Sequence, residues 1–118
     1  ADSIGFAREA ATALLMRSDR PSAILASNDV LALAVLQVAR ANDIRVPEEL
    51  SVIGMDDIFS ASVSAPALTT VAKQRYENGR VAADKLLTLM QGKSLEEQKN
   101  TLLACRLIER ETTCPCRY

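Results

Sequence analysis

Two short apolar segments, separated by one long helical segment, constrain the fold of this chain most strongly. The segments are SAILAS, residues 22–27, and SVIGM, residues 51–55, and a helix is expected between them, from Asn28 and Asp29 to about Ala41. Short strands that are apolar throughout are buried on both faces, which is typical of parallel sheets. The order strand, helix, strand therefore predicts an α/β fold in which both segments pair in parallel.

The remaining periodicity extends this pattern in both directions. Apolar residues recur at helical spacing between Phe6 and Met16, LTTVA from Leu68 predicts a third strand, and TLLACRLIER predicts a final one. A Ser/Ala-rich irregular stretch precedes Leu68, and Ser94 with Glu97 forms a capping-box pattern in a polar turn. A third helix is expected to end at Gly92 and to carry on one face Gly79, Ala82, Ala83, Leu86, Leu87 and Met90. The fold class is thus α/β, with parallel-sheet layers flanked by helices.

Composition and charge narrow the classes of protein. The chain has 118 residues, of which 48% are hydrophobic and 25% charged, as expected for one soluble globular domain. A net charge of -1, with no two adjacent basic residues, gives this chain alone no electrostatic reason to bind DNA. No apolar run reaches membrane-spanning length, and the first residues lack a signal-peptide pattern, so a cytoplasmic protein without membrane contact is expected.

Three cysteines and the absence of histidine bear on metals and redox state. An odd, sparse cysteine count favours a reducing compartment. Cys105 lies in an apolar run, where a small core residue is expected. Cys114 and Cys116 form a CPC motif, which either binds a metal or carries idle thiols, but no histidine exists to complete a common zinc site. We therefore predict neither a metal nor a cofactor.

The helix expected after Asn28 contains seven consecutive apolar residues, Val30 to Leu36. A helix that is apolar on all sides must be buried on more than one side. One side can lie on the sheet, and the other requires a further layer. That layer is either a second subunit or another part of a larger domain.

Polar residues follow the first two strands, where ligands bind in open α/β sheets. They are Ser27, Asn28 and Asp29 after the first strand and Asp56 and Asp57 after the second. An amide and a carboxylate together suit a polyhydroxylated ligand, although Asn28 could instead cap the helix and Asp57 a turn. Asp56, nearest the buried strand, is the stronger candidate. Nucleophile-elbow, phosphate-loop and dinucleotide-binding motifs are absent from the sequence, which therefore does not predict an enzyme.

Four blocks of the sequence resemble the C-terminal part of the lactose/galactose repressor (LacI/GalR) family. They are RPSAILASNDVLALAVL, IRVPEELSVIGMDD, PALTTVAKQRYENGRVAADKLL and RLIERETT, and the likeness runs from about Ile4 to Thr113. It implies a periplasmic-binding-protein-like type I core in which Asn28 and Asp56 hydrogen-bond hydroxyls of an effector. It also implies a dimer surface on the helix after Asn28 and on the stretch after Asp57, with the residues Leu33, Ser60, Val63 and Ser64.

The resemblance further implies how the chain is organised. Residues 1–118 would form the C-terminal portion of an effector-binding domain, and residues 75–100 would contribute to its other subdomain. Operator DNA would be bound only through an N-terminal helix-turn-helix domain missing here, by a homodimer that senses a sugar or other small metabolite. The alternative is a periplasmic sugar-binding protein of a transport system. Met55 departs from the family's aromatic residue, and AKQ at residues 72–74 departs from its usual x-Q-P.

Overall fold

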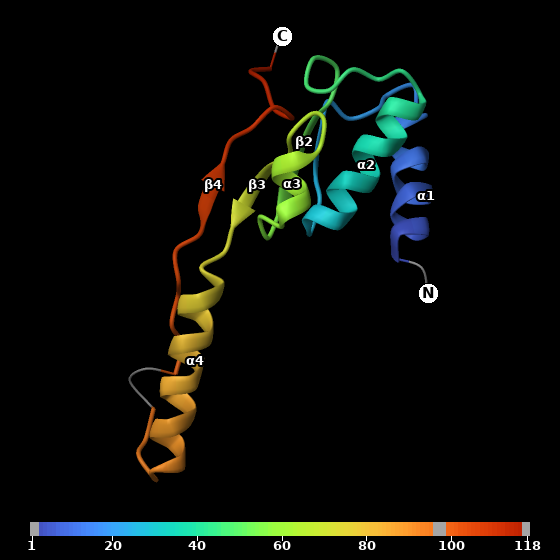
Figure 1. Cartoon of the computed structure of the whole chain (residues 1–118). Coiled ribbons are helices and arrows are strands. Elements are labelled where there is room, and N and C mark those ends of the chain that lie inside the picture. The colour runs from blue at the N-terminus through green and yellow to red at the C-terminus, as the bar shows by residue number, and fades with distance from the viewer. Residues whose placement is uncertain (1–2, 96–98, 117–118) are drawn as a thin grey trace. The chain divides into compact units, whose positions relative to one another are not determined.

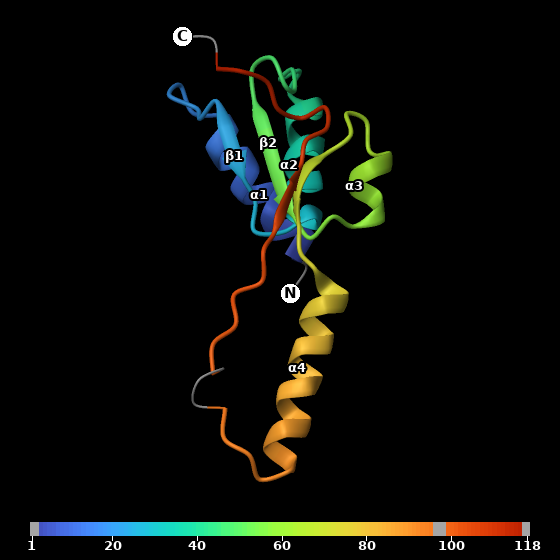
Figure 2. The ribbon, with the colours of Figure 1, turned by 90° about the vertical axis from the view of Figure 1, so that its left-hand side faces the viewer.

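A computed structural model of the chain describes residues 3–95 and 99–116, which divide into two compact units. One unit contains the residues up to Ala72 and those from Leu107 onward, and the other is Lys73–Arg106. In chain order the elements are α1 (Ser3–Leu15), β1 (Ala23–Leu25), α2 (Asp29–Ala41), β2 (Ser51–Met55), α3 (Phe59–Val63), β3 (Thr69–Ala72), α4 (Arg75–Met90) and β4 (Arg106–Ile108). Figure 1 labels all of them except β1, which is labelled in Figure 2.

The sheet confirms the predicted α/β fold with parallel strands. Its four strands follow the order β1-β2-β3-β4. Strand β1 pairs with β2 in parallel, with Leu25 opposite Ile53, and β2 pairs with β3 in parallel, with Met55 opposite Val71. The carboxyl ends of these strands consequently lie at one edge of the sheet, where Asn28 and Asp56 follow β1 and β2.

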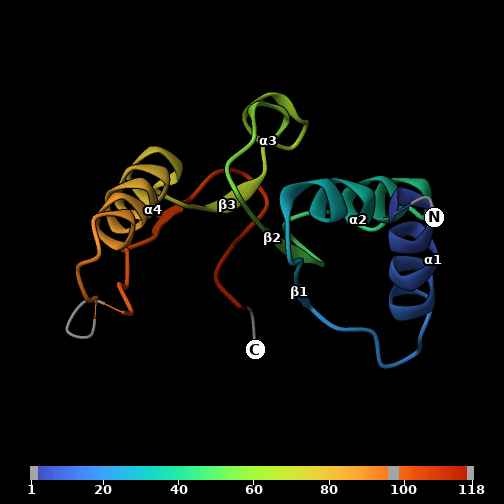
Figure 3. The ribbon, with the colours of Figure 1, turned by 90° about the horizontal axis from the view of Figure 1, so that it is seen from below.

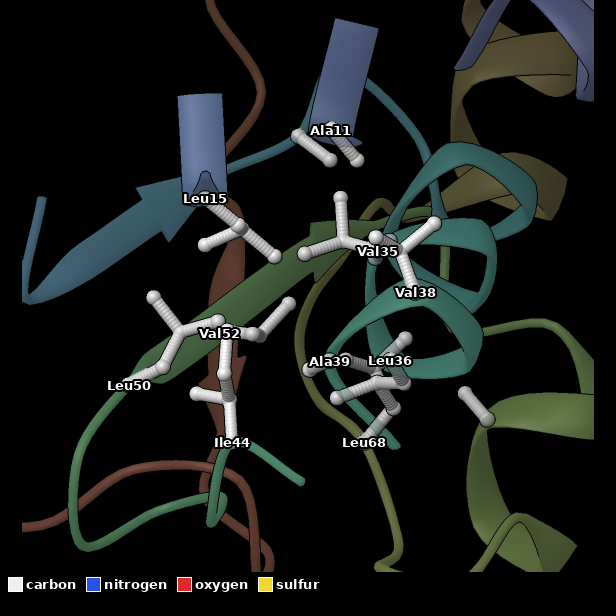
Figure 4. Packing of buried hydrophobic residues seen from close by; sticks show 13 residues of the cluster. Ala11, Leu15, Val35, Leu36, Val38, Ala39, Ile44, Leu50, Val52 and Leu68 are labelled. Atoms are coloured by element: carbon white, nitrogen blue, oxygen red, sulfur yellow. The ribbon is translucent and has the colours of Figure 1, made fainter. Parts of the chain in front are cut away.

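Helices α1 and α2 lie side by side on one face of strands β1 and β2 (Figures 2 and 3). Side chains from both helices and from the sheet interdigitate in a single core, with Leu15, Val35 and Val52 among its members (Figure 4). Strand β2 alternates between buried and half-buried residues because Val52 and Gly54 face these helices. Within residues 3–95 and 99–116, no helix is both long and apolar enough to cross a bilayer.

Thr112 is fully buried and attaches the segment after β4 to the sheet by hydrogen bonds. Its hydroxyl donates to the carbonyl of Val52 at 2.6 Å and accepts from the backbone N–H of Thr69 at 2.9 Å. Its carbonyl accepts from the Val52 N–H at 2.8 Å. Residues far apart in sequence are thereby joined at the start of β2 and β3.

Helix α4 belongs to the unit Lys73–Arg106 and ends as the sequence predicts. Gly92 has φ +73°, and the N–H of Lys93 donates to the carbonyl of Thr88 at 3.2 Å. A glycine with a left-handed backbone, followed by an N–H that donates to a carbonyl of the last helical turn, is a common C-terminal end of a helix. The capping box of Ser94 with Glu97 lies partly outside the described residues, because 96–98 are not among them.

Three sequence-based expectations are wrong. Cys105 is exposed rather than in the core. The last strand covers only Arg106–Ile108, because the apolar residues 102–105 form no ladder. The stretch before Leu68 is not wholly irregular but contains α3, which buries Ala61. A single helical turn between a pair of aspartates and a proline leaves little periodicity in the sequence.

Candidate functional site

Asn28 begins α2 and caps it. Its backbone is extended, with φ -155° and ψ 169°, and its side-chain Oδ1 accepts a hydrogen bond from the Leu31 N–H at 2.9 Å. The capping role expected from the sequence is therefore confirmed. The cap uses only the carbonyl oxygen, so the two N–H donors on Nδ2 are not consumed by it. A capping asparagine can thus still donate to a ligand.

Asp29, the next residue, joins the two loops at this edge of the sheet. Its carboxylate is fully buried and accepts from the Thr70 hydroxyl at 2.5 Å and from the Ile58 N–H at 2.9 Å. The sequence indicated only an acidic residue in the first turn of a helix. Asp29 in fact links the start of α2 to β3 and to the loop after β2.

Gly54 makes this link sterically feasible. A Cβ atom at position 54 would lie 2.2 Å from Oδ1 of Asp29 and 3.2 Å from the Cβ of Ala32. No side chain larger than a hydrogen atom fits beneath the start of α2. The glycine inside the apolar strand therefore lies where α2 packs closely on β2.

Asp56 and Asp57 form a turn with left-handed backbone conformations, at φ 112° and 52°. The N–H of Asp56 donates to the Val71 carbonyl at 2.9 Å, and both side chains are half-buried. Asp57 accepts a hydrogen bond from Nη2 of Arg110 at 2.7 Å, in an ion pair whose side chains are 30% and 18% exposed. Asp57 therefore takes part in an ion pair.

A second cluster of predicted residues lies along α2 and α3. Leu33, Ser60, Val63 and Ser64 all line one surface hollow of about 320 Å³, whose wall also includes Leu36, Gln37, Arg40 and Ala65. Val63 is 62% exposed although it is apolar. The four residues that the family resemblance assigns to a dimer surface therefore line the same hollow.

The cysteine tail packs against the loop before β2. Cys114 donates from Sγ to the Pro47 carbonyl at 3.1 Å, and Cys116 is exposed. In the described ranges, 3–95 and 99–116, no three side chains of His, Cys, Asp or Glu converge as metal ligands would.

The chain matches the model of the periplasmic binding protein-like domain over residues 2–113. It is 42% identical over 93 residues to the HTH-type transcriptional repressor CytR of Escherichia coli K12, with 79% of this chain and 27% of CytR covered. It is 41% identical over 101 residues to the HTH-type transcriptional regulator DegA of Bacillus subtilis 168, covering 86% and 30%. The chain therefore spans less than a third of the length of these two regulators.

Solved structures give the same result. A LacI family transcriptional regulator from Bifidobacterium animalis superposes with TM-score 0.88 at 36% identity, covering 98% of this chain and 42% of that one. A LacI family regulator from Arthrobacter in complex with lactose gives 0.83 at 38% identity, covering 95% and 42%. The Lac repressor dimer bound to operator and an anti-inducer gives 0.84 at 31% identity, covering 92% and 37%.

These similar proteins are transcriptional regulators of the LacI type, not enzymes. The expected family resemblance is thereby confirmed.

Proposed function

Because this chain belongs to the periplasmic-binding-protein-like domain family, we propose that it forms the C-terminal portion of the effector-binding domain of a transcriptional repressor. The observation that carries the proposal is that Asn28 and Asp56 follow the carboxyl ends of two adjacent parallel strands. This edge is where ligands bind in open α/β sheets. Asp29 fixes the loops that carry both residues by bonding the Ile58 N–H.

The proposed effector is a small polyhydroxylated metabolite, in the class of sugars. Nδ2 of Asn28 can donate two hydrogen bonds, and the Asp56 carboxylate can accept bonds from two hydroxyls. Lactose is bound by the similar Arthrobacter regulator, which supports a sugar here. No cofactor or metal is required for such binding.

Three further parts of the proposal concern the second subdomain, DNA binding and the location of the protein. Residues 75–100 would contribute to the second subdomain of the effector core, in keeping with the separate unit Lys73–Arg106. Operator DNA would be contacted by a helix-turn-helix domain outside these 118 residues, in a cytoplasmic protein. The similar CytR and DegA, named as helix-turn-helix regulators, support this arrangement.

We also propose that two copies associate through the hollow lined by Leu33, Ser60, Val63 and Ser64. Exposed apolar side chains around a concave surface favour a protein partner. The similar Lac repressor is a dimer, which favours a second copy of the chain as that partner.

Substitution of Asp56 by Asn tests the effector contact in a full-length regulator that carries this segment. Asparagine tolerates the left-handed conformation of residue 56, so the turn is preserved while the charge is lost. A hydrogen bond to a charged group contributes about 1.5 to 3 kcal/mol, so affinity for the bound sugar should fall about ten- to a hundredfold.

The readout is calorimetric titration with lactose, cellobiose and L-arabinose, together with the melting temperature of the free protein. Asp19→Asn, in an exposed ion pair with Arg17, is the matched control. Unchanged sugar affinity with a lowered melting temperature would show that Asp56 is structural, and Asn28 would then be the remaining candidate.

Substitution of Leu33 by Asp tests the dimer surface. A charge placed in a buried contact without a partner costs several kcal/mol, so the dimer should dissociate into folded monomers in sedimentation experiments. Leu14→Asp, on a 42% exposed side chain of α1, is the control and should leave association unchanged. A Leu33→Asp protein that remains dimeric would place the interface elsewhere.

A further inference from the structure

The turn that carries Asp56 has an unfavourable backbone conformation. Asp56 has φ 112° and Asp57 has φ 52°, values that L-residues adopt rarely. Such conformations persist only where the surroundings hold them in place. Contacts from outside the turn must therefore hold it, and its geometry determines where the Asp56 carboxylate points.

Three backbone N–H groups of the turn are bonded to the sheet and to α2. The Asp56 N–H donates to the Val71 carbonyl at 2.9 Å, and the Asp57 N–H makes a long bond of 3.4 Å to the Thr70 hydroxyl. The Ile58 N–H donates to the buried Asp29 carboxylate at 2.9 Å. The weakest of the three bonds is at Asp57, so a contact to the Asp57 side chain has the most to contribute.

That contact comes from Arg110, which lies 53 positions further along the chain. Its Nη2 donates to Oδ1 of Asp57 at 2.7 Å, and its Nη1 donates to the Leu68 carbonyl at 2.9 Å. Its backbone N–H donates to the Thr69 hydroxyl at 3.0 Å. The guanidinium is 18% exposed and is anchored to the start of β3 at the same time as it holds the turn.

We propose that Arg110 is a positioning residue of the effector site, which holds the Asp56–Asp57 turn in its left-handed conformation through the ion pair with Asp57. This inference rests on the proposed role of Asp56 as an effector contact. The proposed role requires no contact between Arg110 and the effector. The planar guanidinium suits the task because it can donate in two directions within one plane, which an ammonium group on a flexible chain does less well.

The first experiment needs no effector and uses the 118-residue chain. Amide hydrogen exchange is compared between wild type, Arg110→Met and the control Arg17→Met, which breaks an exposed ion pair. Arg110→Met should speed exchange at the amides of Asp56 and Ile58 about tenfold, corresponding to about 1.4 kcal/mol. Exchange at Ala26, whose N–H donates to the Ile53 carbonyl at 2.9 Å, should not change. Unchanged protection of Asp56 and Ile58 in Arg110→Met would overturn the proposal.

The second experiment measures sugar affinity in a full-length regulator that carries this segment, using whichever of lactose, cellobiose and L-arabinose binds the wild type. Arg110→Met, Asp57→Asn and the double variant should each bind about tenfold more weakly, because all three remove the same ion pair. A purely structural role would lower the melting temperature without changing affinity. Equal affinity in wild type and Arg110→Met, or additive losses in the double variant, would refute the positioning role.

The two failures are distinguishable. If the wild type binds none of the three sugars, the proposed effector class is wrong, while the exchange experiment still decides whether Arg110 holds the turn. If a sugar binds and Asp56→Asn weakens it but Arg110→Met does not, the proposed function stands and the inference about Arg110 falls.

Discussion

Replacing Gly54 by Ala should be among the most damaging single-methyl additions in this chain. The new Cβ would lie 2.2 Å from Oδ1 of Asp29, 3.0 Å from Cδ2 of Leu68 and 3.2 Å from the Cβ of Ala32. The first distance is far below a van der Waals contact. Either α2 moves away from β2, or the Asp29 carboxylate rotates out of its site.

Both responses cost free energy that can be approximated. Overpacking of a well-packed core costs about 1 to 3 kcal/mol. Rotation of Asp29 breaks its bonds with the Thr70 hydroxyl and the Ile58 N–H, and a hydrogen bond to a charged group contributes about 1.5 to 3 kcal/mol. Because the chain takes the cheaper response, we expect a loss of about 2 to 3 kcal/mol, in the upper part of the overpacking range. That is a large share of the roughly 5 to 15 kcal/mol that stabilise a typical domain.

Two other glycines provide matched controls with the same chemical change. Gly79 lies inside α4 with nothing within 4 Å of an added Cβ, so Ala there should stabilise the helix by about 0.5 to 1 kcal/mol. Gly92 also has open space, but its φ of +73° should make Ala cost about 1 to 2 kcal/mol. Three identical substitutions should therefore give one large loss, one small gain and one moderate loss.

Urea unfolding followed by far-UV circular dichroism measures the loss at Gly54. Amide exchange in α4 reports the two controls, since that helix belongs to the other compact unit. If the free energy of unfolding of Gly54→Ala lies within about 0.5 kcal/mol of the wild-type value, the close approach of Asp29 to β2 is refuted. Changes that small are typical of substitutions at the protein surface.

Two further predictions concern contacts away from the candidate site. Thr112→Val keeps the shape of a fully buried side chain but removes the bonds that the hydroxyl makes with the Val52 carbonyl and the Thr69 N–H. The free energy of unfolding measured in urea should fall by about 1 to 3 kcal/mol. A change below about 0.5 kcal/mol would contradict the assigned bonds. The hydrogen bond from the Arg45 side chain lowers the pKa of Glu49 in the folded protein. The ionised Glu49 should therefore stabilise the fold above its unfolded-state pKa of about 4.3. This stabilisation should be lost as the pH falls through the lower folded-state pKa. Urea midpoints of wild type and Glu49→Gln should therefore converge in acid, and parallel curves would contradict the assignment.

Local signals in the sequence were sufficient for much of the fold. Strand β2 spans the predicted residues Ser51–Met55, and α2 begins after its predicted cap, Asn28. Both signals act within a few residues, through capping and apolar pattern. The apolar run at residues 101–105 misled for the same reason, because a strand also needs a partner, and hydropathy does not report one.

Contacts between distant residues were beyond local reasoning. The bond from Thr70 to Asp29 spans 41 positions, and neither residue type signals a buried pair by itself. Gly54 was the available clue, since a glycine inside an apolar strand marks a close approach of another group. The cluster of Leu33, Ser60, Val63 and Ser64 was likewise predicted only through resemblance, because α3 has little periodicity to reveal it.

The two adjacent aspartates illustrate why resemblance and geometry were both required. In the sequence, Asp56 and Asp57 are chemically identical and differ only in their distance from the buried strand. The fold makes them different by placing the Arg110 guanidinium 2.7 Å from one of them. A carboxylate already paired with a half-buried arginine gains little from a ligand hydroxyl, because its charge is already stabilised by the protein. Asp57 is therefore the poorer candidate for a ligand contact.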